Sequence, residues 1–228
     1  MPVALVTGAS RGLGLALARA LADREWDLVL DARGGDALAE ATAEFAGRSR
    51  IIAIAGDVAD PGHRAALVDA ARSLGGLDVL VNNASTLGPS PLPRLAEFPL
   101  DALDTVFRVN VAAPLALIQS TLPLMRPGGR VVNVTSDAGV EGYTGWGGYG
   151  ASKAALEQLS RVLATELPEL RVYWADPGDM NTQMHQDAYP GEDITDRPPP
   201  ESSVPGLLVL IDGDLPSGRY VARQLVAA

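Results

Sequence analysis

The chain has 228 residues, which fits one domain, and its composition of 47% hydrophobic and 20% charged residues is that of a globular protein with a packed core. A formal net charge of -10 opposes binding to nucleic acids and anionic membranes, because both need clustered lysine and arginine. With no cysteine and only two histidines, His63 and His185, disulfides, thiolate metal sites and histidine-rich metal sites are excluded.

Neither a leader peptide nor a membrane segment is expected. The first residues, MPVALVTGAS, lack the basic start and long apolar stretch of a signal peptide. No apolar run approaches the roughly 20 residues of a membrane span. We therefore expect a cytoplasmic protein.

Short apolar runs alternate with segments of helical spacing along the whole chain. In the first connection, for example, Leu13, Leu17 and Leu21 recur every four residues. This alternation predicts right-handed βαβ units in one domain over residues 1–228, a doubly wound α/β fold with helices on both faces of a parallel seven-stranded sheet. The candidate strands are residues 3–7, 27–32, 50–55, 78–83, 130–135, 170–175 and 219–225.

Three longer segments depart from this simple alternation. Helical segments at 101–125 and 149–167 carry more apolar positions than a solvated face needs, so we expect them to pack against another subunit in a homodimer or homotetramer. Residues 179–205 are polar, rich in proline and aperiodic, which predicts an irregular lid over a substrate.

The stretch VTGASRGLG joins the first strand to the first helix. Gly8 permits a tight turn, Gly12 lets the backbone approach a phosphate closely, and Gly14 lets the helix pack on the strand. A pyrophosphate would then lie at the helix N-terminus, where free N–H groups favour an anion. The spacing differs from the general G-x-G-x-x-G fingerprint, so a glycine-rich turn without a ligand stays open as an alternative.

Further motifs follow in order and, with TGxxxGxG at 7–14, resemble the short-chain dehydrogenase/reductase family over essentially the whole chain. They are Asp57 and Val58, NNAS at 82–85, VTSDAG around Ser136, YGASK at 149–153 and PGDMNT at 177–182. Ser85 stands where the family usually has the last glycine of NNAG. The resemblance implies a Rossmann-like fold and NAD(P)-dependent oxidoreductase chemistry. It implies a cofactor site of Gly8, Ser10, Arg11, Gly12, Leu13, Gly14, Arg33, Asp57, Val58, Asn83, Ala84, Tyr149, Lys153, Pro177, Gly178, Met180 and Thr182.

The end of the second strand bears on the choice of nicotinamide cofactor. Against the family pattern, the carboxylate position of NAD-dependent members falls on Ala32, and Asp31 should face the other side of the sheet. Arg33 follows, and with Arg11 it suits the 2′-phosphate of NADP(H), which we favour over NAD(H). A register shift of one residue would reverse this preference, and two merely solvated arginines are the alternative.

The resemblance also implies a catalytic set of Asn110, Ser136, Tyr149 and Lys153. Tyr149 would be the general acid/base. Lys153, one helical turn away, would lower the pKa of the phenol, ordinarily about 10, together with a positively charged nicotinamide, and would bind the nicotinamide ribose. Ser136 would bind the substrate oxygen. Asn110 would interrupt its helix and hold a water that relays protons to Lys153.

The loop before Tyr149 is rich in glycine and aromatic residues, and we place Tyr143 and Trp146 there in the substrate wall, with Met184 from the lid. The expected reaction is hydride transfer between NADP(H) and a carbonyl or secondary alcohol of a small or medium organic substrate. Two alternatives stay open, a regulatory or scaffold protein of the same fold without turnover, and an epimerase or imine reductase. The sequence leaves the substrate, the reaction direction and the stereochemistry open.

Overall fold

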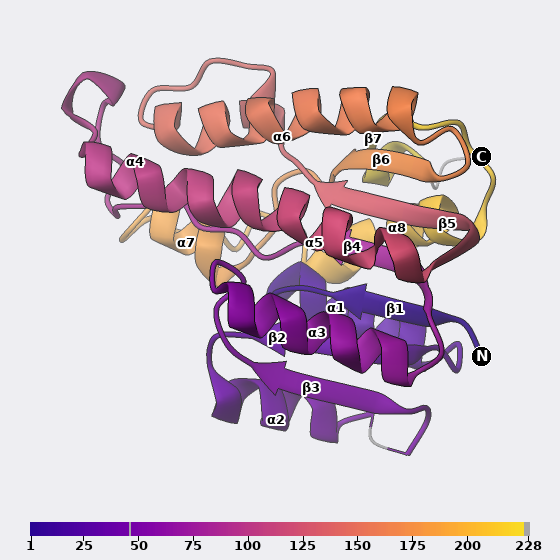
Figure 1. Cartoon of the computed structure of the whole chain (residues 1–228). Helices are drawn as coiled ribbons and strands as arrows, with labels where there is room; N and C mark the ends of the chain where they lie inside the picture. The colour runs from indigo at the N-terminus through magenta and orange to yellow at the C-terminus, as the bar shows by residue number, and fades with distance from the viewer. Residues whose placement is uncertain (46, 226–228) are drawn as a thin grey trace.

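A computed structural model describes residues 1–45 and 47–225. Its centre is a parallel sheet of seven strands in the order β3-β2-β1-β4-β5-β6-β7 (Figure 1). The doubly wound α/β fold expected from the sequence is therefore confirmed. The strands are β1 (Val3–Val6), β2 (Asp27–Ala32), β3 (Ile51–Ala55), β4 (Leu77–Asn82), β5 (Met125–Val134), β6 (Arg171–Asp176) and β7 (Gly218–Val221).

Helices cover both faces of this sheet. In Figure 1, α3, α5 and α6 lie in front of the strands and α1, α2 and α8 lie behind them, while α7 lies beyond the carboxyl ends of the strands. The helices are α1 (Gly12–Ala22), α2 (Gly35–Ala43), α3 (Pro61–Ser73), α4 (Leu100–Phe107), α5 (Ala113–Thr121), α6 (Gly147–Glu166), α7 (Gln183–Ala188) and α8 (Val204–Asp212). None of these described helices is long and apolar enough to cross a membrane.

The strand side chains alternate between two cores. Ala4 and Val6 of β1 pack into the core formed with α1 and α8. Val3 and Leu5 pack into the other core, with α3 and α5. All four are fully buried, as the period of two along a strand covered on both faces requires. The strands are therefore apolar on consecutive positions, which is why they stood out in the sequence.

Three segments differ from the expectation. Strand β5 begins at Met125, where it pairs with Leu77 of β4, and not at residue 130. The last strand ends at Val221 and not at residue 225, because the chain turns into a 3-10 helix at Ala222–Gln224 and packs against α8, where a Cβ on Gly206 would lie 1.8 Å from the Ala222 carbonyl oxygen. Residues 179–205 are not irregular throughout. They contain α7, whose first turn is capped by the Thr182 hydroxyl accepting from the His185 N–H, and the 3-10 helix Pro200–Ser203.

Candidate active site

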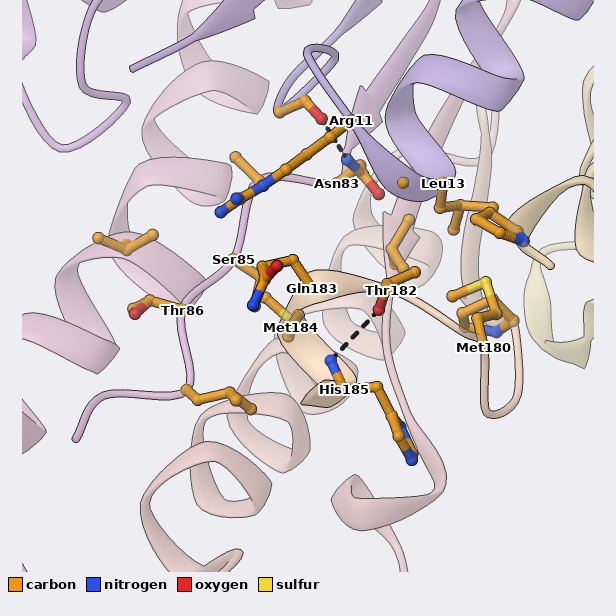
Figure 2. A pocket seen from close by; sticks show the side chains of 18 of the residues that line it. Arg11, Leu13, Asn83, Ser85, Thr86, Met180, Thr182, Gln183, Met184 and His185 are labelled. Atoms are coloured by element: carbon orange, nitrogen blue, oxygen red, sulfur yellow. Dashed lines mark hydrogen bonds between the residues drawn. The ribbon is translucent and has the colours of Figure 1, made fainter. Parts of the chain in front are cut away.

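The carboxyl ends of the strands open into a cavity of about 690 Å³. Strand order reverses between β1 and β4, and ligands of open α/β sheets bind at such a switch point. In Figure 2, Arg11 and Asn83 come from the β1–α1 turn and the end of β4 at the top, and Met184 and His185 come from α7 below. The cavity thus lies between segments about 100 residues or more apart in the chain.

Each glycine of the β1–α1 turn is needed for a different structural reason. Gly8 has φ +68°, and a Cβ there would lie 3.0 Å from the Ala84 Cα. A Cβ on Gly14 would lie 2.3 Å from the Gly8 carbonyl oxygen, so Gly14 lets α1 pack onto the turn. Gly12 has φ +56°, and a Cβ there would have only Thr182 within 4 Å, at 3.5 Å. The backbone at Gly12 therefore borders the cavity itself.

Strand β4 braces this turn. The Thr7 hydroxyl accepts from the N–H groups of Asn83 (3.0 Å) and Ala84 (2.9 Å), and the Asn83 amide donates to the carbonyl oxygens of Thr7 (2.8 Å) and Gly8 (3.1 Å). The N-cap residue of α1, Arg11, makes no side-chain capping bond. The first N–H groups of α1 are thus uncapped by a side chain beside the cavity, which suits a phosphate group. The turn fits a dinucleotide.

The other expected cofactor residues gather around the same cavity. Its lining includes every one of them except Gly14, which packs beneath the turn. Arg11 and Arg33 are both exposed at its edge. Asp31 is buried and its carboxylate is engaged elsewhere, since Oδ1 accepts from the Gly8 N–H at 2.8 Å and Oδ2 lies 3.0 Å from His63 Nε2.

Tyr149 and Lys153 lie one turn apart near the start of α6, both buried, with the lysine Nζ 5.4 Å from the centre of the phenol ring. The Lys153 ammonium donates to the Val134 carbonyl oxygen at 2.8 Å. Ser136 follows the same strand, β5, and its hydroxyl donates to Asp137 Oδ1 at 2.9 Å. The structure brings Ser136, Tyr149 and Lys153 together at the cavity wall.

Burial acts on the two titratable groups of this set in opposite directions. It raises the pKa of the Tyr149 phenol above its ordinary value, against the opposing effect of the Ser136 and Ser85 hydroxyls. It lowers the pKa of Lys153 to about 8. In the protein chain alone the pKa of Tyr149 is therefore raised, because desolvation of the phenol is the largest effect and Lys153 is not among its main causes. The expected lowering by Lys153 together with a positively charged nicotinamide stays a prediction for the cofactor-bound site.

Asn110 lies behind the cavity wall and not in it. It is buried in a π-helical segment, Arg108–Ala112, between α4 and α5, so the expected local interruption of the helix is confirmed. Its Oδ1 accepts from the Thr86 N–H (2.9 Å), and its Nδ2 donates to the Thr86 carbonyl oxygen (2.9 Å) and the Ser152 hydroxyl (3.0 Å). The water relay remains a prediction.

Of the three expected substrate residues, Trp146 and Met184 line the cavity. Tyr143 does not: it is 47% exposed, donates to Asp137 Oδ2 at 3.0 Å, and lines a separate, shallower groove. The glycine-rich loop turns it outward. Sequence reasoning missed Leu87, which lines the cavity, and gave Ser85 no substrate role. The buried Ser85 hydroxyl makes no hydrogen bond of ordinary length among the described residues, but it lies near enough to the Tyr149 phenol to lower its pKa.

A doubly wound sheet with a glycine turn at its switch point and a buried tyrosine and lysine beside it defines the class of dinucleotide-binding oxidoreductases. A family model described as short chain dehydrogenase matches residues 2–193. The chain belongs to the short-chain dehydrogenase/reductase family of oxidoreductases.

Individual relatives agree with this assignment. The chain is 33% identical over 195 residues to the benzil reductase ((S)-benzoin forming) of Saccharomyces cerevisiae, a match covering 81% of this chain and 74% of that protein. A solved short chain dehydrogenase from Pseudomonas syringae superposes with a TM-score of 0.90 at 33% identity, over 97% of this chain and 94% of the other. One from Shigella flexneri, complexed with NADP, gives 0.88 at 28% identity, over 97% of both chains.

Proposed function

We propose that the protein is an NADP(H)-dependent carbonyl reductase or alcohol dehydrogenase with Tyr149 as its general acid/base. This proposal rests on one observation: two groups of residues share the same cavity. Ser136, Tyr149 and Lys153 lie on its wall, and Arg11 and Arg33 lie at its edge. A hydride-transfer site and a 2′-phosphate site would then belong to the same bound dinucleotide. A cytoplasmic location is part of this proposal, supported by the absence of cysteine.

In carbonyl reduction, the carbonyl carbon accepts a hydride from the reduced nicotinamide. Tyr149 donates a proton to the carbonyl oxygen as negative charge develops there, and Ser136 donates a hydrogen bond to the same oxygen. The raised pKa of Tyr149 keeps the phenol protonated at neutral pH, which is the form that reduction needs. Ser136 must exchange its present acceptor, Asp137, for the substrate oxygen.

The substrate end of the cavity favours apolar, aromatic ketones. Leu87, Trp146 and Met184 line it, and they belong to an apolar cluster that includes Tyr149, Ala188 and Tyr189. The Trp146 ring centre lies 5.6 Å from that of Tyr149 and 6.1 Å from that of Tyr189. Rings at these distances pack directly against one another, so they form a rigid apolar wall against which an aromatic substrate group can pack. Benzil, the diketone in the name of the yeast relative, is therefore a reasonable first probe.

The test of the reaction is NADPH oxidation measured against a panel of aromatic and aliphatic ketones. We expect turnover by the wild type and a fall of at least about 100-fold in kcat for Tyr149→Phe, since general acid catalysis contributes about 10² to 10⁴. Tyr143→Phe is the matched control, because it removes a phenol hydroxyl outside the cavity. Equal activity of Tyr149→Phe and Tyr143→Phe would refute the assignment.

The test of cofactor preference is Arg33→Ala. Loss of the guanidinium should raise the Kd for NADP⁺ about tenfold and leave that for NAD⁺ nearly unchanged, because NAD⁺ has no 2′-phosphate. Arg72→Ala on α3, whose side chain is 59% exposed and pairs with Asp69, is the control. An unchanged ratio of the two Kd values would contradict the preference for NADP(H).

A regulatory protein of the same fold would bind NADPH and oxidise none of it in the presence of any ketone or imine. The presence of Ser136, Tyr149 and Lys153 together speaks against it, because binding alone does not need a general acid. Imine reduction and epimerisation keep the same cofactor chemistry. Imines in the substrate panel and recovery of epimerised alcohols without net NADPH consumption distinguish them.

A further inference from the structure

One buried ionisable pair near the cavity, Asp31 and His63, has no part in the chemistry proposed above. Asp31 is 1% exposed at the end of β2, and His63 on α3 is 9% exposed. Asp31 Oδ2 and His63 Nε2 are 3.0 Å apart. A carboxylate is costly to bury, so a partner from another element at this distance is a necessary part of its environment.

Asp31 holds the glycine turn by two separate hydrogen bonds. Its carboxylate Oδ1 accepts from the Gly8 N–H at 2.8 Å, and its backbone carbonyl oxygen accepts from the Ala9 N–H at 2.8 Å. Gly8 has φ +68°, and because glycine adopts positive and negative φ about equally readily, the bond from its N–H helps to select this conformation. The carboxylate therefore fixes the first residue of the turn.

His63 holds the Asp31 carboxylate in place, and Gly56 leaves room for the imidazole ring of His63. A Cβ on Gly56 would lie 2.2 Å from His63 Nδ1 and 2.6 Å from Cγ, so the imidazole fills the space of the missing side chain. With the ring held there, Asp31 has one orientation, in which one oxygen faces Gly8 and the other faces His63. Three strand ends, those of β1, β2 and β3, are joined by this arrangement to α3.

We propose that His63 is a positioning residue for dinucleotide binding, acting through Asp31 on the phosphate-binding turn. The proposal rests on the dinucleotide site proposed above and concerns affinity, not chemistry. Under this proposal, His63 and Arg33 affect different parts of the bound dinucleotide. Arg33 bears on the 2′-phosphate alone, whereas a displaced Gly8 turn weakens contacts to the pyrophosphate, which NADP⁺ and NAD⁺ share.

The experiment measures Kd for NADP⁺ and for NAD⁺ by calorimetry on the full chain. His63→Leu removes the donor at similar volume, and we expect both Kd values to rise by about the same factor, about tenfold, since a hydrogen bond to a charged group is lost. His63→Gln keeps an N–H donor near the position of Nε2 and should restore most of the affinity. Gly56→Ala leaves His63 chemically intact and displaces its ring, so it should act like His63→Leu.

Circular dichroism and thermal unfolding establish that each variant is folded at the temperature of the titration, and Arg72→Ala is the control on the same helix. Unchanged Kd values for folded His63→Leu, or no recovery by His63→Gln, would overturn the proposal. So would a change confined to NADP⁺, which would assign His63 to the 2′-phosphate. A wild type that binds both dinucleotides and reduces no ketone refutes the proposed function and leaves this comparison intact.

Discussion

Tyr149 and Lys153 are buried side by side, and this burial shifts their pKa values in opposite directions. Their spacing in the sequence does not predict these shifts. The phenol holds its proton more strongly and the ammonium holds its proton less strongly. At neutral pH this leaves a protonated tyrosine next to a charged lysine, which is the combination that the proposed proton donation to a ketone oxygen needs.

The lowered pKa of Lys153 predicts a pH limit on ketone reduction. With a pKa of about 8 in the free enzyme, the ammonium is charged below that pH and loses its proton as the pH rises through it, so kcat/KM for NADPH should fall above pH 8. Lys153→Arg keeps its charge at all accessible pH values and should abolish this alkaline fall, whatever its absolute rate. Steady-state rates from pH 6 to 9.5 measure it. A wild-type profile that stays flat to pH 9.5 contradicts the prediction.

Ser85 should affect the reverse reaction. Its hydroxyl lowers the pKa of Tyr149, and alcohol oxidation needs the phenolate. Replacing it should therefore raise the pH at which oxidation reaches half its maximum rate. The rate profile of Ser85→Ala with NADP⁺ and a secondary alcohol is the measurement, with Thr86→Ser as a conservative control at the next position. A shift to lower pH would show that the Ser85 hydroxyl does not stabilise the phenolate.

At this scale the sequence predicted which residues meet and not their energetics. The four-residue spacing of Tyr149 and Lys153 predicted one helix face. The direction of the pKa shift depends on how much chain covers the phenol, which spacing does not contain. The partnership of Asp31 with His63 was equally invisible, because it joins residues on different elements.

Among the elements, the edge strand β7 is tied to the site by one arginine. Arg219 Nε donates to the buried Glu157 of α6 at 3.0 Å, and its Nη2 donates to Asp176 Oδ2 at 3.1 Å and the Ser136 carbonyl oxygen at 3.3 Å. Glu157 also accepts from the Thr135 hydroxyl at 2.8 Å. The ends of β5 and β6, which lead into Ser136 and the Pro177 turn, are thus joined through β7.

Removing this arginine should be costly because it leaves the buried Asp176 without its cationic partner and leaves Glu157 with only Arg161, whose Nη2 lies 3.5 Å from Glu157 Oε2. For Arg219→Met we expect the free energy of unfolding to fall by about 3 kcal/mol. The double variant Arg219→Met with Glu157→Gln removes one of the two charges and keeps the acceptor for Thr135, so it should recover part of the loss. Urea unfolding measures both. A double variant less stable than the single one would contradict this explanation.

The strands were the most predictable elements and α7 the least. The central strands are covered on both faces, so their apolar runs are nearly complete and visible in the sequence, whereas the edge strands β3 and β7 are only partly buried. Helix α7 has only six residues, lies between proline-rich stretches and depends on the Thr182 cap, so it has no long apolar period to detect. The lid role of residues 179–205 stays a prediction, although α7 does line the cavity with Met184 and His185.

On the scale of the whole molecule, apolar side chains remain exposed on α4 and α6. Leu100 is 75% exposed and Val162 is 42% exposed. We infer a homodimer or homotetramer in which these helices contact another subunit, and isologous contact is the simplest arrangement.

Size-exclusion chromatography with light scattering tests this inference. The wild type should elute at a multiple of 23.7 kDa, and Val162→Asp should shift the population toward that monomer mass, because it places a charge in an apolar contact. Arg72→Asp, on a charged surface of α3, should leave the mass unchanged. A wild type that is monomeric at micromolar concentration would refute the inference.

The π-helical segment Arg108–Ala112 makes the exact number of residues between α4 and α5 important. A π-turn holds one residue more than the α-helical turn it replaces. Deleting a single residue such as Val109 would let α4 and α5 merge into an uninterrupted α-helix. Because the wide turn absorbs the extra residue, the flanking helices would keep their buried faces and the change would fall on the turn itself, moving the Asn110 amide away from Thr86 and Ser152. In this part of the chain, therefore, a shorter and more regular helix would lose the Asn110 contacts, and single-residue deletions should be tolerated less well than substitutions.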